Sequence, residues 1–267
     1  MSVTRLQAEL DARREFVARL EQERTDLQIE VDAFRQAYLA RLGAAQAELE
    51  SLELHVAEYR LRNELIRLRG SALDAAKLEA EVDWQLRGRR EQFAGYRESV
   101  RQAAGAAPAA RPPADPATQR DLKSLYHDLA KRAHPDLALD EADRAARGAR
   151  MVAINAAYAR LDRAALKAIA AQLDGLAGDP LPVSAGQLRA EIERLDGVIA
   201  AMRAEMAELN QSDWMAMKLD AALARSRRID WFDRAQRQIE ARVAERREEL
   251  DGLIAVFMGL VRQAGLD

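Results

Sequence analysis

The stretch RDLKSLYHDLAKRAHPD, residues 120–136, combines a clear helical period with an abrupt stop. Its apolar residues recur at steps of three and four, which places them on one face of an amphipathic helix. That face comprises Leu122, Leu125, Tyr126, Leu129 and Ala133, and the flank left toward solvent comprises Lys123, His127, Lys131 and Arg132. Pro135 lacks an N–H and disfavours the helical conformation in the preceding residue, so the helix is predicted to end at or just before His134. We therefore expect the imidazole of His134 and the carboxylate of Asp136 at a stiff, exposed turn.

A second amphipathic helix is predicted after a short acidic loop. In residues 147–161, RGARMVAINAAYARL, one helical face comprises Met151, Ile154, Ala157, Tyr158 and Leu161. Asp115 followed by Pro116 is typical of an N-cap and a first helical position, so the first helix should begin at about residue 116. Asp140 gives a similar cap for the second helix, and Asp162 is predicted to cap a further short helix that stops at Gly175.

The helix pair and its His-Pro-Asp turn resemble helix II, the signature tripeptide and helix III of a J domain, the DnaJ-type module. The resemblance covers about residues 116–173 and implies a core of Leu122, Leu125, Tyr126, Leu129, Met151, Ile154, Tyr158 and Leu161. It also implies docking on a DnaK-type chaperone and stimulation of its ATP hydrolysis. The residues to which it assigns the trigger are His134, Pro135 and Asp136. An acidic patch on the chaperone would meet the basic flank of Lys123, His127, Lys131 and Arg132.

J domains usually open with an aromatic-rich helix I, and the Ala/Pro stretch before Asp115 contains no such segment. Trp84, Phe93 and Tyr96 lie on roughly one side of a weaker helical pattern over residues 60–103. We interpret these three aromatic residues as packing residues, and one arrangement would place them over the J-like pair where helix I normally lies. A cofactor pocket is disfavoured, because no convergent polar groups accompany them.

Composition favours helices over a large core. The chain of 267 residues is 49% hydrophobic and 32% charged but only 5% aromatic. Its net charge of -3 argues against a general nucleic-acid binder, which needs a basic surface. There is no cysteine, which excludes disulfides and thiolate metal sites. The first twenty residues carry alternating charges and residues 253–261 are too short to span a bilayer, so we expect a cytoplasmic protein without a membrane segment.

Heptad seams are predicted on both sides of the J-like segment. Residues 6–38 and then 42–59 follow alternating steps of four and three with mostly apolar residues. Joining the two series requires consecutive four-residue steps just before Gly43, which marks either a local unwinding or the tip of a hairpin. Arg13 and Arg24 interrupt the first seam and suggest a partner strand that lets each guanidinium reach water.

The C-terminal part carries the clearest heptad, over residues 188–209, and a further seam over 229–260. A turn at 226–230, SRRID, would give two arms of nearly equal length, so an antiparallel hairpin is favoured over one rod. A turn at 210–213 is the alternative and leaves unequal arms. Both intrachain hairpins and a homodimer are compatible with these seams.

The predicted fold is all-α, with a J-domain helical hairpin between two long coiled-coil segments that are expected to be antiparallel hairpins. This layout also resembles a group of bacterial J-domain proteins of unassigned role. The segments are an N-terminal coiled coil at 1–103, an Ala/Pro-rich linker at 104–115, a J-like domain at 116–177, a linker at 178–186 and a C-terminal coiled-coil hairpin at 187–267.

The expected function is that of a co-chaperone for a DnaK-type chaperone, with coils that bind a client or a partner. An enzyme is not expected, because no nucleophile or oxyanion-hole loop accompanies His134 and Asp136. Neither His55 nor His127 lies at a spacing that would complete a metal site with them, and no glycine-rich phosphate loop is present. We expect no metal, cofactor or nucleic acid.

Two alternatives to the co-chaperone remain open at this stage. The first is a coiled-coil scaffold whose J-like hairpin binds proteins but no longer stimulates a chaperone, with the tripeptide serving only as a capped turn. The second is a coiled coil associated with nucleic acid, which steep salt dependence of DNA binding would support.

Overall fold

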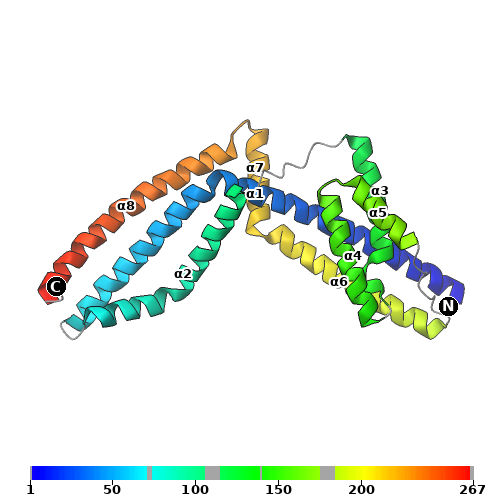
Figure 1. The fold of residues 1–267 in the computed structure, drawn as a ribbon, viewed down its shortest axis with the longest axis horizontal. Coiled ribbons are helices and arrows are strands. Elements are labelled where there is room, and N and C mark those ends of the chain that lie inside the picture. Colours follow the sequence, from blue (N-terminus) through cyan, green and yellow to red (C-terminus); the bar gives the residue numbers. More distant parts are fainter. Residues whose placement is uncertain (1, 71–73, 106–114, 139, 175–183, 265–267) are drawn as a thin grey trace. The chain divides into compact units, whose positions relative to one another are not determined.

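The protein is described here from a computed structural model, over residues 2–70, 74–105, 115–138, 140–174 and 184–264. Every regular element in these ranges is helical, which confirms the predicted all-α class (Figure 1). The elements are α1 (Val3–Arg69), α2 (Ala75–Gly105), α3 (Pro116–Ala133), the 3₁₀ turn η2 (Pro135–Leu137), α4 (Glu141–Ala159), α5 (Arg163–Asp174), α6 (Ala185–Gln211), α7 (Asp213–Ser226) and α8 (Trp231–Ala264). None of these helices combines the length and the apolar composition needed to cross a bilayer.

The chain divides into two compact units that share α1. Unit 1 combines Met1–Ala33 with Ala110–Ala216, and unit 2 combines Phe34–Ala109 with Met217–Asp267. The expected N-terminal coiled coil, 1–103, is therefore split between the units, because the two halves of α1 pack into different cores. Most of the predicted linkers at 104–115 and 178–186, and the predicted stop at Gly175, lie outside the described residues.

Unit 1 contains the antiparallel pair α3 and α4. Asp115 and Asp140 cap the two helices by accepting hydrogen bonds from backbone N–H groups of the first turn, as predicted. Asp162 caps α5 in the same way, by accepting from the N–H of Ala165 at 2.9 Å. α3 ends at Ala133 because the backbone before Pro135 is extended, with ψ of 129° at His134. The local signals in the sequence thus fix the ends of these helices.

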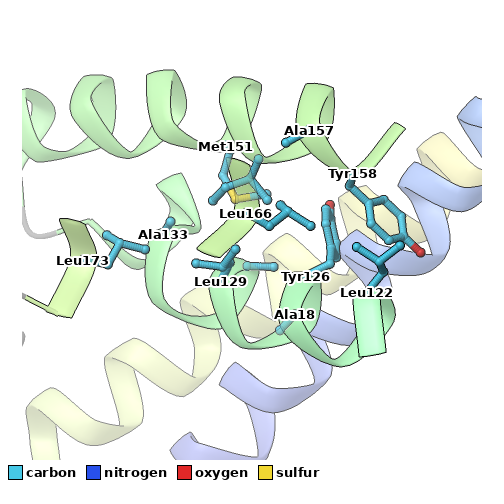
Figure 2. Packing of buried hydrophobic residues seen from close by; sticks show 12 residues of the cluster. Ala18, Leu122, Tyr126, Leu129, Ala133, Met151, Ala157, Tyr158, Leu166 and Leu173 are labelled. Carbon is cyan, nitrogen blue, oxygen red and sulfur yellow. The ribbon is translucent and has the colours of Figure 1, made fainter. Parts of the chain in front are cut away.

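The apolar faces of α3, α4 and α5 meet in one buried cluster (Figure 2). The rings of Tyr126 and Tyr158 lie at its centre, with their centroids 4.4 Å apart. Six of the eight residues expected in a J-domain core are buried in this cluster, namely Leu122, Tyr126, Leu129, Met151, Ile154 and Tyr158. The other two, Leu125 and Leu161, are partly buried against it. The cluster also includes Ala18 of α1, so residues from outside the helix pair complete this core.

The seam of the first half of α1 packs against α6. Leu10 and Val17 of α1 and Leu195 of α6 are fully buried in this second cluster. The two arginines in the seam reach carboxylates on α6, with Arg13 Nε 3.1 Å from Asp196 and Arg24 Nη1 2.7 Å from Glu205. The partner strand that these arginines required is therefore α6, which runs parallel to α1.

Unit 2 is built on the second half of α1, which pairs with α2 and α8. α1 runs without interruption through Gly43, so that residue does not mark the tip of a hairpin. A Cβ on Gly43 would lie 3.0 Å from a methyl carbon of Val100, which shows that the glycine permits close approach of α2. The chain instead reverses after Gly70, whose φ of +52° suits a glycine.

The predicted C-terminal hairpin, 187–267, is wrong. The arms that were expected to pair with each other each pack against α1, through Leu195 of α6 and Val243 of α8. A helix ends at each of the two proposed turns. Ser212 is the C-cap of α6, and α7 ends shortly before Arg228, whose φ is +59°. The physical reason is that an apolar heptad seam specifies a complementary stripe but not which helix supplies it.

Candidate functional site

The His-Pro-Asp tripeptide forms a tight turn at the end of α3. His134 is both the C-cap of α3 and the N-cap of η2, and its Nδ1 accepts a hydrogen bond from the N–H of Asp136 at 3.2 Å. Pro135 occupies the first position of η2, where its missing N–H costs nothing. The carboxylate of Asp136 is partly exposed and lies 3.9 Å from Arg144. The histidine cap and the proline ring thus restrain the backbone of the turn.

The expectation that the turn displays its imidazole to solvent is wrong. His134 is only 4% exposed, and its Nε2 lies 3.8 Å from Oε2 of Glu21 in α1. His134 is buried because of Leu137, three residues further along the chain. Leu137 is 6% exposed and packs into the seam between α1 and α6. Burying that leucine draws the whole turn onto the two long helices.

The two nitrogens of the His134 ring have different roles. Because Nδ1 accepts from the backbone, we infer that the neutral ring carries its proton on Nε2, which faces Glu21. Burial disfavours the charged form of Glu21, but the polar contact with His134 and the charge of Arg24 outweigh it, so the pKa of Glu21 lies below its ordinary value. A buried, ionised carboxylate thus holds the imidazole in place.

The basic flank of α3 is paired within the chain. Lys123 Nζ lies 2.9 Å from Asp26, and Lys131 Nζ lies 2.8 Å from Glu15. Glu15 is also 3.1 Å from Nε2 of His127. The hydrogen bond from Lys131, together with the nearby charge of His127, lowers the pKa of Glu15 despite some desolvation. The carboxylates that face the two lysines belong to α1, whereas His127 lies between Glu15 of α1 and Asp128 of its own helix, 3.9 Å from its Nδ1.

Arg132 does not pair with a carboxylate of α1, unlike Lys123 and Lys131. Its guanidinium turns toward α5 and lies 2.8 Å from the carboxylate of Asp174. The structure thus places Lys123, His127 and Lys131 along one side of α3 and Arg132 on another. All four side chains keep some exposure, from 20% for His127 to 52% for Lys123.

A network of hydroxyl groups fixes α1 on the hairpin. The hydroxyl of Tyr126 lies 2.9 Å from that of Thr25 and donates to Asn155 at 2.8 Å. The hydroxyl of Tyr158 donates to Asp26 at 2.8 Å. Sequence reasoning missed this interface. Its signal is a second stripe on α1, beside the heptad seam, of Ala18, Thr25 and Ile29.

Sequence reasoning also missed Arg147, which is 6% exposed beneath the turn. Its guanidinium donates to the carbonyl of Arg132 at 2.8 Å and to Asp143 at 2.8 Å. The first bond satisfies a carbonyl in the last turn of α3, which has no partner within the helix. Arg147 therefore ties the start of α4 to the end of α3 and sets the geometry of the turn between them.

A hollow of about 310 Å³ lies beside the turn, bordered by α1, α4 and α6. Its lining includes His134 and Asp136 from the turn, Met151 and Val152 from α4, and Val198 and Met202 from α6. Across the described ranges, no three side chains of the metal-binding types converge.

No protein-family model, curated protein or solved structure matches this chain. The J-domain resemblance therefore depends on the tripeptide, the capped helix pair and the core described above.

Proposed function

We propose that the protein is a cytoplasmic co-chaperone that docks on a DnaK-type chaperone through His134, Pro135 and Asp136 and stimulates its ATP hydrolysis. In this proposal the long helices bind a client or a partner. The observation that carries the proposal is the turn itself, in which a rigid His-Pro-Asp corner joins two capped antiparallel helices around Tyr126 and Tyr158.

The charge on α3 supports the same function. Lys123, His127 and Lys131 follow one side of the helix that leads into the turn, and lysine side chains 52% and 46% exposed can exchange partners readily. Complementary charge would raise the rate of encounter with an acidic surface and orient the complex, more than it would add affinity.

The test is the steady-state ATPase rate of a purified DnaK-type chaperone from the same organism, with the protein added at increasing concentration. Stimulation by the wild type and its loss in His134→Gln are the expected results. His55→Gln is a matched control, because it makes the same chemical change at an exposed histidine in unit 2. Equal rates with the wild type and His134→Gln would remove the co-chaperone function.

A scaffold without chaperone stimulation is the second candidate. The burial of His134 against Glu21 favours it, since a docking residue that is 4% exposed cannot meet a partner in this conformation. A scaffold would leave the ATPase rate unchanged while the long helices still bound their partner. Binding measured by calorimetry alongside the ATPase rate separates the two candidates.

A further inference from the structure

We propose that residues 15–29 of α1, here called the covering segment, inhibit the docking surface by occupying it. The conformation described above is then a closed state, and an open state would release α3 and the turn from α1. This inference concerns the regulation of the proposed co-chaperone site and rests on that function. It explains how the imidazole of His134 can belong to a docking motif although it is only 4% exposed in this conformation.

The charges of the covering segment match those expected of the partner. Glu15 meets Lys131 and His127, Asp26 meets Lys123, and Glu21 meets His134. The J-domain resemblance assigns Lys123, His127 and Lys131 to an acidic chaperone surface, and it assigns His134 to the trigger. The carboxylates of the covering segment therefore compete with an acidic chaperone surface for the same basic side chains, and His134 is only 4% exposed while α1 is in place. Occupation by α1 thus opposes docking.

The chemistry of the contact suits a reversible cover. Between the covering segment and the hairpin, the described contacts are mainly ion pairs and hydroxyl bonds, joined by Ala18 and the partly buried Ile29. Each of those polar groups finds an equivalent partner in water when the segment leaves. The seam between α1 and α6, by contrast, is lined by leucines and stays buried.

Leu137 stabilises the closed state by anchoring the turn in the seam between α1 and α6. It follows the tripeptide directly and belongs to the cluster formed by α1 and α6, not to the cluster of the hairpin. α6 also borders the hollow beside the turn, through Val198 and Met202. An open state must therefore withdraw Leu137 from the seam as well as break the ion pairs.

The first test reverses two charges of the covering segment. Glu15→Lys together with Asp26→Lys would repel Lys131 and Lys123, and Asp26→Lys also removes the acceptor of the Tyr158 hydroxyl within the same contact. We expect the concentration for half-maximal ATPase stimulation to fall about tenfold, since apparent affinity scales with the open fraction. Glu23→Lys with Asp32→Lys is the matched control: it adds the same charge at exposed positions of α1 in unit 1.

The second test fixes the covering segment to α3 with a covalent tether. The natural chain has no cysteine, so Asp26→Cys with Lys123→Cys introduces the only two thiols, at side chains that lie 2.9 Å apart. A bismaleimide with a reducible bridge would tether α1 to α3, and stimulation should fall at least tenfold and return on reduction. The same variant blocked with N-ethylmaleimide also lacks Lys123 but carries no tether, so its stimulation is the reference against which the tethered protein is compared.

The outcomes separate this inference from the proposed function. If the charge-reversed and wild-type proteins stimulate equally, and His134→Gln abolishes stimulation in both, the co-chaperone function stands and the inhibition is overturned. An equal gain with the control pair, or unchanged stimulation in the tethered protein, also overturns it. If neither the wild type nor the charge-reversed protein stimulates, the co-chaperone function fails and the inhibition fails with it.

Discussion

Nε2 of His134 lies 3.8 Å from Oε2 of Glu21, and the two side chains are 5% and 2% exposed. Residues more than a hundred positions apart thus form a buried pair that joins the turn to α1. Arg24 completes this group, with its Nη2 2.7 Å from the same carboxylate oxygen. A buried carboxylate is stable when such partners are present and costly when one of them is removed. The pair therefore has consequences for stability that can be measured without any partner protein.

Glu21→Gln should destabilise the protein in a pH-dependent way. The pKa of Glu21 is below its ordinary value of 4.5 in the folded state, so its ionisation stabilises the fold above that value. This contribution is lost as the pH falls through the lowered folded-state pKa. We expect a difference of about 1.5–3 kcal/mol at pH 7 that shrinks below pH ~4.5. Urea unfolding of both proteins from pH 7 to pH 3 measures it, and a constant difference would contradict it.

Tyr126→Phe should weaken the attachment of α1 to the hairpin. The change removes a buried hydroxyl that is bonded to both Thr25 and Asn155, and leaves these groups without that partner. The expected loss is about 1–2 kcal/mol in the free energy of unfolding. A double-mutant cycle with Thr25→Val should give a coupling energy of at least ~0.5 kcal/mol. Additive losses would mean that the two hydroxyls do not interact.

Leu137→Ala should loosen the turn as well as lower stability. Truncating a buried leucine costs about 2–4 kcal/mol, and here it removes the apolar contact between the turn and the long helices while the His134–Glu21 pair remains. The N–H of Asp136, which is bonded to His134, should then exchange with deuterium faster. Leu173→Ala is the control, because it truncates a similarly buried leucine in the hairpin cluster. The comparison is made under conditions where both variants are fully folded, and equal exchange at Asp136 would count against the anchoring role.

Two glycines in unit 2 should respond in opposite directions. Gly88→Ala should stabilise α2 by about 0.5–1 kcal/mol, because nothing lies near the added methyl group and alanine favours a helix. Gly43→Leu should destabilise by about 1–3 kcal/mol, because Val100 occupies the space. Adding Val100→Ala should restore part of that loss. Thermal unfolding followed by circular dichroism reports all three changes, and equal effects of Gly43→Leu and Gly88→Leu would refute the close approach.

The parts of the fold that could be predicted are those encoded locally. A cap such as Asp115 acts within its own first turn, and Pro135 acts on the residue before it, so both helix ends follow from neighbouring residues. The core of the hairpin follows from helical periodicity for the same reason. The positions of Arg13 and Arg24 in the seam of α1 also indicated that this seam packs against another helix. They did not indicate that the helix is α6.

The burial of His134 could not be predicted, because it depends on residues far away in the sequence. The part of α1 that covers the turn and the hairpin carries Ala18, Glu21 and Thr25, and such a mixture is indistinguishable from a solvated face in the sequence alone. Trp84, Phe93 and Tyr96 were candidates for this covering role. They lie on α2 in unit 2, and Trp84 is 71% exposed, whereas the segment that packs on the hairpin comes from α1.

Because Ala18 completes the cluster around Tyr126, the motif and its surroundings are not one contiguous piece of polypeptide. A recombinant fragment starting at Asp115 would hold every residue of the tripeptide and both of its helices, yet none of the acidic side chains of α1. Such a fragment would remove the Asp26 acceptor of the Tyr158 hydroxyl and leave Lys123 and Lys131 without their carboxylate partners on α1. The solubility and the activity of such a fragment would differ from those of a chain that includes α1, so experiments on the tripeptide should keep α1 in place.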